Sequence, residues 1–200
     1  GSVTVTKKFP GITAGQGASF SLYGDLVFAG AATMDSFLGL WRHELNSTGS
    51  VIFTNGCQLA CQRILNNPSG FYPLRQVCHD GGYVTCGDVY FTRHNGDSAA
   101  PYTYFMRSGT RTTTNANGVC LGVYYTGTWA RYSGGAFVMS GGTVNTARLA
   151  LGMPDSVFDL RGGDVYLGSG GITSTTNNQG SFKLGGVALR ATANWSSSWK

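Results

Sequence analysis

The chain has 200 residues, only 12% of them charged, and a formal net charge of +5. Glu occurs once, at Glu44, so helices with the usual Glu- and Lys-rich outer face are not expected. The ten arginines are scattered singly, which argues against a nucleic-acid partner, and no segment is long and apolar enough for membrane insertion.

The length fits a single domain, residues 1–200, with a hydrophobic core of its own. Gly is abundant, with 31 residues, and Ser, Thr and Asn are also common. Such a surface is typical of extracellular and viral surface proteins. Gly1 and Ser2 read as a cloning remnant, so we expect the C-terminal piece of a longer chain.

In the N-terminal third, alternation at period two and short apolar runs predict strands at 3–6, 19–23, 25–29, 37–45 and 50–54. The last two of these flank a turn and are expected to form a hairpin. Next comes the segment 57–66, which is interpreted as one short helix because its apolar residues fall at helical spacing, with another buried strand as the alternative.

From Phe71 onward, short apolar runs alternate with turns. Strands are expected at 83–86, 88–92, 102–106, 111–114, 118–125, 128–132, 136–139, 147–151, 157–160, 164–167, 181–184 and 187–195. This spacing is typical of an all-β fold, an antiparallel sandwich or barrel, and we expect an antiparallel β-sandwich or jelly-roll-like head. Gly-Gly pairs recur between the runs and indicate hairpin turns or sharp bends, or else sites where backbones approach closely; they lie at 81–82, 134–135, 141–142, 162–163, 170–171 and 185–186.

The five cysteines are an odd number, so at least one thiol has no partner within the chain for a disulfide. They lie at 57, 61, 78, 86 and 120, without the paired spacing and the nearby His of a metal site. We therefore expect no metal, and five reduced, mostly buried thiols that behave as small apolar side chains.

The stretch Gly96-Asp97-Ser98 looks like the nucleophile loop of a chymotrypsin-type protease. The chain order argues against that role, because His79 lies too close before Ser98 and too much chain follows it. A Gly-Asp-Ser turn is the preferred interpretation.

No other catalytic constellation is expected. The chain has no metalloprotease, Walker or dinucleotide-binding motif, so no cofactor is expected. Asp159 and Asp164 are kept as a glycosidase carboxylate pair, although their Leu-Arg-Gly-Gly setting reads better as a turn. The sequence therefore favours a protein that is not an enzyme.

Aromatic and Arg side chains in polar, Gly-rich settings are the candidate ligand-binding residues, because rigid aromatic faces beside Arg suit contacts with sugars or proteins. An aromatic residue at any one of these positions could instead face the core. The predicted binding residues are Tyr102, Tyr104, Arg107, Trp129, Arg131 and Tyr132.

Two stretches, GITAGQGASFSLYGDLVFAG (11–30) and RGGDVYLGSGGITSTTNNQGSFKLGGVALRA (161–191), carry a resemblance. They resemble the C-terminal receptor-binding tip domains of trimeric viral and phage tail fibres and of fibre-like bacterial adhesins. The resemblance implies a homotrimer whose distal loops bind a cell-surface glycan or protein. A shorter stretch, FYPLRQVCHDGGYVTCGDVY (71–90), is similar to part of the jelly-roll spike protein of small icosahedral microviruses. Neither resemblance carries functional residues across.

These observations together predict the receptor-binding tip of a trimeric fibre or adhesin, at a virion or cell surface and without catalysis. The alternatives are a structural jelly-roll capsid or spike subunit, and an extracellular glycan hydrolase.

Overall fold

The computed structural model describes residues 3–5, 26–33, 38–39, 50–66, 76–91, 93–94, 103–122, 132–174, 180–195 and 197. Within these residues every regular element is a strand, so the predicted all-β class is confirmed. No helix in this part of the chain is long and apolar enough to cross a membrane.

The strands are numbered in the order in which they occur along the chain. In order, they are β1 (Val3–Val5), β2 (Leu26–Phe28), β3 (Ala31–Thr33), β4 (Leu38–Gly39), β5 (Ser50–Phe53), β6 (Gln58–Asn66), β7 (Gln76–Phe91), β8 (Arg93–His94), β9 (Thr103–Thr113), β10 (Val119–Leu121), β11 (Tyr132–Ser133), β12 (Ala136–Met139), β13 (Thr143–Leu151), β14 (Val157–Leu160), β15 (Asp164–Ser174), β16 (Ser181–Leu184) and β17 (Ala188–Ala191).

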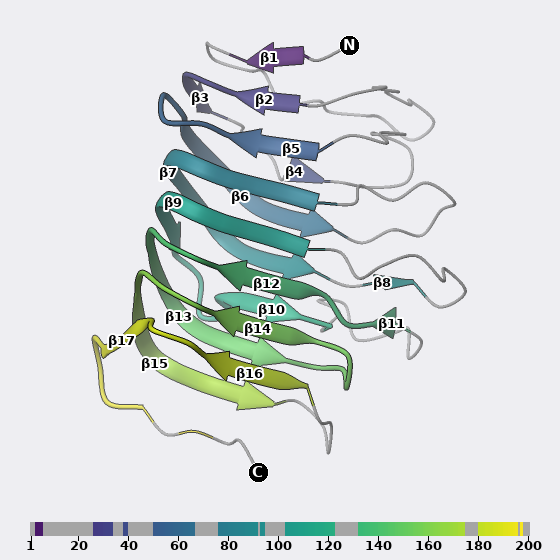
Figure 1. Ribbon diagram of the computed structural model, residues 1–200, viewed down its shortest axis with the longest axis vertical. Helices are drawn as coiled ribbons and strands as arrows, with labels where there is room; N and C mark the ends of the chain where they lie inside the picture. Colours follow the sequence, from purple (N-terminus) through teal and green to yellow (C-terminus); the bar gives the residue numbers. More distant parts are fainter. Residues whose placement is uncertain are drawn as a thin grey trace.

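These strands form a parallel β-solenoid, in which each coil of the chain lies on the coil before it (Figure 1). We call a series of residues that pair with one another across successive strands a register column. One such column contains, in order, Val51, Val77, Tyr104, Phe137, Phe158 and Phe182. Coil follows coil from β1 at one end to β16 and β17 at the other.

The expectation of antiparallel pairing, and with it the sandwich or jelly roll, was wrong for the described strands. Their pairings are parallel except for the short pair β8–β11. The reason lies in the connections. Residues bonded across the sheet are about one coil apart in sequence, as Phe28 is from Phe53, whereas a hairpin would pair near neighbours.

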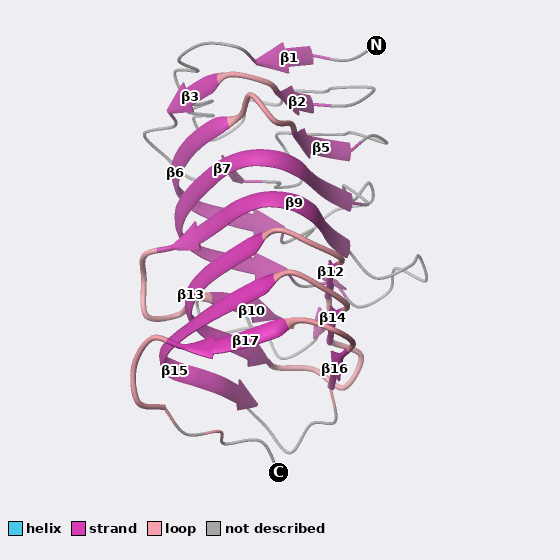
Figure 2. Cartoon of the chain, turned by 60° about the vertical axis from the view of Figure 1, so that its left-hand side comes forward, coloured by secondary structure: helices cyan, strands magenta, loops and turns pink. Residues whose placement is uncertain are grey.

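The coil has three faces, which we call A, B and C. Face A contains β1, β2, β5, β12, β14, β16 and the first segments of β7 and β9. Face B contains β3, β17, the first halves of β6, β13 and β15, the middle of β7 and the end of β9. Face C contains β4, β10 and the last segments of β6, β7, β13 and β15. Figure 2 shows long strands such as β7, β9 and β13 bending from one face to the next.

The helix predicted near 57–66 was wrong, because this segment is the strand β6. Leu59 is buried while Gln58 and Ala60 on either side are exposed. Burial therefore alternates at period two, as in a strand with one side toward the core. The apolar residues at helical spacing do not reflect a helix.

Four of the six Gly-Gly pairs, 81–82, 141–142, 162–163 and 185–186, lie at the bend between faces A and B, and the single Gly109 takes the same place in β9. Gly109, Gly142 and Gly163 have φ of 84°, 85° and 88°, a region that other residues rarely adopt. A Cβ on Gly142 would come within 2.7 Å of the carbonyl oxygen of Gly109, and one on Gly163 within 2.4 Å of that of Gly142. The glycines thus stack from coil to coil, so both the sharp bend and the close backbone approach expected from the sequence are present here.

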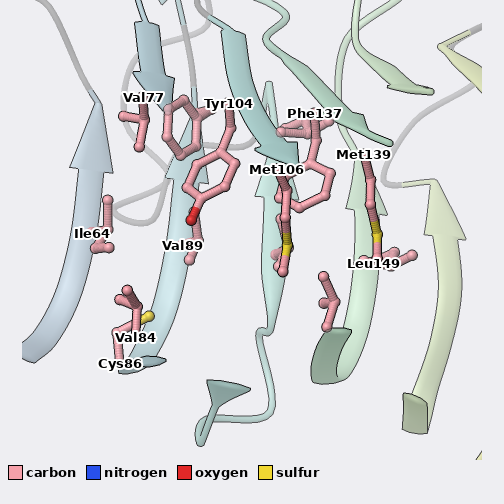
Figure 3. Packing of buried hydrophobic residues seen from close by; sticks show 14 of the residues in the cluster. Ile64, Val77, Val84, Cys86, Val89, Tyr104, Met106, Phe137, Met139 and Leu149 are labelled. Carbon is pink, nitrogen blue, oxygen red and sulfur yellow. The ribbon is translucent and has the colours of Figure 1, made fainter. Parts of the chain in front are cut away.

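The core lies inside the coils, where inward side chains stack in register columns. Rings succeed one another along face A. Tyr104 stacks on Phe137 with their centroids 4.9 Å apart, and Phe158 follows at 5.9 Å from Phe137. Figure 3 shows Tyr104, Phe137, Met106 and Met139 pointing into the enclosed space. Each such aromatic contact adds about 0.5–1.5 kcal/mol beyond the burial of its area.

Candidate functional site: the outer surface of face B and a polar cluster inside the coils

The outer surface of face B carries two columns of polar and aromatic side chains, which we call the face-B ladder. The first column contains Tyr83, Thr110, Thr143 and Asp164, and the second contains Thr85, Thr112, Asn145, Tyr166 and Arg190. These residues alternate with inward ones along each strand, so the pleat directs them outward. Register pairing then stacks them along the solenoid.

The face-B ladder offers an aromatic face beside many hydrogen-bonding groups. Tyr83 is 64% exposed, the most exposed of the large hydrophobic residues that the structure describes. The Asn145 side-chain amide donates to the Thr112 hydroxyl at 3.3 Å. An aromatic ring can stack on a sugar ring while hydroxyls and amides bond its polar groups, so the surface carries the kinds of group that contact carbohydrate.

The ladder ends in a paired charge. Arg190 bonds Asp164 at 2.9 Å and lies over the ring of Tyr166, with Cζ 5.9 Å from its centroid. The neighbouring carboxylate raises the pKa of the Arg190 guanidinium further above its usual range. The guanidinium is therefore already engaged with an anion of its own chain.

Two other exposed arginines on the described part of the chain are engaged in the same way. Arg107 bonds Asp80 at 2.6 Å and lies over the Phe105 ring, and Arg161 bonds Asp159 at 2.6 Å. The hydrogen bond from Arg161 holds the pKa of the Asp159 carboxyl below its ordinary value. A carboxylate ligand at any of these three sites would have to displace an existing partner.

The structure does not bring the residues predicted from the sequence onto one surface. Tyr104 is buried inside the coils, so its predicted place on a binding surface was wrong. Arg107 is exposed, but on face A and paired with Asp80. Tyr102, Trp129 and Arg131 lie outside the described residues, and Tyr132 belongs to β11 with its side chain not described.

The two carboxylates kept as a glycosidase pair lie on different faces. Asp159 is on β14 of face A and Asp164 is on β15 of face B, with the Gly162–Gly163 bend between them. Each is bonded to a different arginine. The structure therefore gives no reason to assign them a joint catalytic role. Ser98 lies outside the described residues.

A second polar group lies inside the coils, where Arg111 occupies an inward position of face B. Its neighbours in that register column are Val84 and Val144. The Arg111 guanidinium donates to the Tyr104 hydroxyl, from Nε at 3.1 Å, and to the Cys86 sulfur at 3.4 Å. The Tyr104 hydroxyl also lies 3.0 Å from Nδ1 of His79. We call these four side chains, His79, Tyr104, Arg111 and Cys86, the interior polar cluster.

Burial and the Arg111 charge determine the ionisation of this cluster. Desolvation, aided by Arg111, lowers the pKa of His79 to about 3, so the imidazole is neutral. Desolvation also raises the pKa of Tyr104 to about 12, against the opposing effect of Arg111. Hydrogen bonding from Cys61 and the Arg111 charge together hold the pKa of Cys86 below its ordinary value. The guanidinium is thus the fixed charge of the cluster.

Sequence reasoning missed both the ladder and the cluster. Thr110 and Thr112, two residues apart on one strand, were the signal for the ladder. Arg111 between them, where a half-buried strand would have an apolar residue, was the signal for the cluster. Within the described residues, no group of three or more His, Cys, Asp or Glu side chains is placed to hold a metal ion. Comparison with known proteins gives no match to any family model, curated protein or solved structure.

Proposed function

We propose that this chain is a binding module that attaches to a cell-surface glycan through the face-B ladder, without catalysis, as part of a homotrimeric fibre or adhesin at a virion or cell surface. The observation that carries the proposal is the ladder itself. It presents Tyr83 beside two columns of hydroxyl and amide groups on one outer face.

A solenoid suits an extended, repeating ligand. Successive parallel strands lie about 4.8 Å apart, so the ladder offers similar groups at regular steps along its axis. The backbone beneath is hydrogen-bonded from coil to coil, which keeps these groups in place before the ligand arrives. A preorganised surface loses less entropy on binding than a flexible loop does.

The charges of the described surface favour a neutral glycan over an acidic one. Arg107, Arg161 and Arg190 each bond a carboxylate of the chain itself. Binding a sialic acid or a uronic acid at these sites would break such a pair, whereas a neutral sugar can stack on Tyr83 and leave them intact.

The trimer is supported by an apolar column on the outer side of face A. Ile52, Phe105 and Val138 are half-buried there, and Cys78, in register between Ile52 and Phe105, is buried. The column runs along the solenoid, so copies of the chain can pack against it side by side with their axes aligned. Three copies would also multiply weak binding at single sites through avidity.

Binding is tested on an array of neutral and acidic glycans, with Tyr83→Ala and Leu184→Ala compared. Tyr83 and Leu184 are both large and exposed, but Leu184 is on β16 at the end of face A. We expect binding to neutral glycans, at least tenfold weaker in Tyr83→Ala and unchanged in Leu184→Ala. Loss of binding in neither variant, or silence of the whole array, would contradict the proposal.

The oligomer is tested by light scattering on the purified chain. We expect a trimer that dissociates on Phe105→Asp and persists on Thr85→Asp, which places the same charge on the outer side of face B. A monomeric wild-type chain would exclude this part of the proposal and leave the glycan test unaffected.

A further inference from the structure

Two cysteines occupy the same register position in adjacent coils. Cys61 on β6 and Cys86 on β7 are Cα partners, at the bend between faces B and C. Neighbouring parallel strands are about 4.8 Å apart, and disulfides join residues whose Cα atoms are about 4.4–6.8 Å apart. The two side chains also lie close together, because hydrogen bonding from Cys61 is the largest cause that lowers the pKa of Cys86.

No other two cysteines are register partners in the described strands. Cys78 pairs with Ile52 and Phe105, and Cys120 pairs with Tyr90 and Ala150. Four of the five thiols are buried and Cys61 is half-buried, which agrees with the mostly buried cysteines expected from the sequence. The geometry therefore singles out one pair, with one member that solvent reaches.

Arg111 lies beside Cys86, the buried cysteine of this pair. Its Nη1 donates to the Cys86 sulfur at 3.4 Å, and its guanidinium is fully buried. Among the described residues its hydrogen bonds go to Tyr104 and Cys86, and none reaches a carboxylate. A buried cation of this kind favours an anionic sulfur beside it, and the thiolate is the reactive form of cysteine.

We propose that Cys61 and Cys86 are a redox-modifiable pair, which a small-molecule disulfide oxidises to a disulfide bond between adjacent coils. The half-buried Cys61 loses its proton to solvent and attacks the small disulfide, which releases one thiol and leaves a mixed disulfide on Cys61. The Cys86 thiolate then attacks the Cys61 sulfur, forms the bond between the coils and releases the second thiol. The two cysteines lose two electrons, which reduce the small disulfide to two thiols.

The bond would close a loop of one coil and tie β6 to β7. Such a link restricts the unfolded chain and opposes separation of the two coils. It would form when the protein leaves a reducing compartment for an oxidising one, which is the passage that a surface protein makes. The inference does not depend on the glycan proposal.

The test uses the reduced wild-type protein and oxidised glutathione as the oxidant. We expect the thiols titrated after denaturation to fall from the five of the reduced chain by two. Peptide mapping by tandem mass spectrometry should then show Cys61 linked to Cys86. A full complement of thiols after oxidation, or a link that involves Cys78, overturns the proposal.

Three variants separate the two steps. Cys86→Ser should stop the reaction at the first step, with a stable glutathione adduct on Cys61. Cys61→Ser should form neither the adduct nor the link, because Cys86 is only 1% exposed. Cys120→Ser is the matched control, because Cys120 has no cysteine among its register partners, and it should behave as the wild type does in this oxidation. An adduct on Cys86 in the Cys61→Ser chain, with circular dichroism unchanged, would overturn the proposed order of steps.

Discussion

The coils built on β7 and β9 and those built on β12 to β15 share one backbone plan but enclose different side chains. At one inward column of face A, His79 is followed by Met106, Met139 and Leu160. At one inward column of face B, Arg111 is followed by Val144 and Val165. The polar members are confined to β7 and β9, and the later coils are apolar at the same positions.

Register in the solenoid fixes where a side chain points but not what that side chain must be. Arg111 is tolerated because Tyr104 and Cys86 lie within reach of its donors and the rings of Tyr104 and Phe53 face its charge at 4.9 and 5.6 Å. A buried polar group costs little only when its partners are present. We call the coils built on β7 and β9 the polar coils and those built on β12 to β15 the apolar coils. The stability of the polar coils should therefore depend on pH and oxidation, while that of the apolar coils should depend on neither.

The largest effect is expected from adding a second arginine inside the coils, at an apolar position. Val144 is 1% exposed and is the register partner of Arg111, so Val144→Arg buries a cation without the cluster that surrounds Arg111. We expect a loss of at least about 4 kcal/mol in the free energy of unfolding, measured by chemical denaturation.

The matched control is Asn145→Arg, one residue along β13 and on the outer surface. It should change the stability by less than about 0.5 kcal/mol. Equal stability of the two variants would show that the apolar coils accept a buried charge as readily as the polar coils do. It would contradict the claim that a buried arginine needs the partners that surround Arg111.

A smaller effect is expected from acid, through His79. Its pKa is about 3 in the folded chain and about 6.5 when unfolded, so below about pH 6 the unfolded state binds a proton that the folded state does not. Above about pH 6.5 the imidazole is neutral in both states and the free energy of unfolding is unaffected. As the pH falls from about 6.5 toward 3, protonation of the unfolded state lowers the free energy of unfolding by about 1.4 kcal/mol per pH unit. Denaturation curves at pH 7, 6, 5 and 4 measure the slope.

The control for this slope is His79→Met, which gives β7 the residue that β9 and β12 carry in the same column. Other titrating groups are common to both chains, so the difference between the two slopes belongs to His79. Slopes that match between pH 6 and 4 would show that the buried imidazole does not couple protonation to folding.

Sequence patterns indicated the strand content but not the way in which the strands pair. Period-two alternation predicts a strand with one buried side, and segments such as 136–139 and 181–184 coincide with β12 and β16. Alternation is the same in a hairpin and in a solenoid coil. The direction of pairing follows from contacts about one coil apart in the sequence, and no local pattern reports them.

The coil repeat is not visible in the sequence, because the number of residues in a coil varies. From Gly142 to Gly163 a coil takes 21 residues, whereas from Gly109 to Gly142 it takes 33. Loops of different length absorb the difference, so self-similarity at a fixed period does not show. The stacked glycines are the recurring signal, and aligning the chain on them would have placed Tyr104 above Phe137 and inside the core.

The smallest effect is expected from removing the buried charge altogether, by Arg111→Met. Replacing a buried ionic group with an apolar side chain of similar volume is often close to neutral, and Met fills the same position between Val84 and Val144. The Tyr104 hydroxyl keeps its bond to His79, and Cys86 can become a neutral thiol, so no charged group is left buried without a partner. We expect a change within about 1.5 kcal/mol at neutral pH, measured by chemical denaturation. Truncation by Arg111→Ala should reduce the free energy of unfolding more than Arg111→Met does, because it leaves a cavity. A loss of about 4 kcal/mol or more in Arg111→Met would mean that the guanidinium holds β7 and β9 together, and the polar coils would then depend on their cluster for folding.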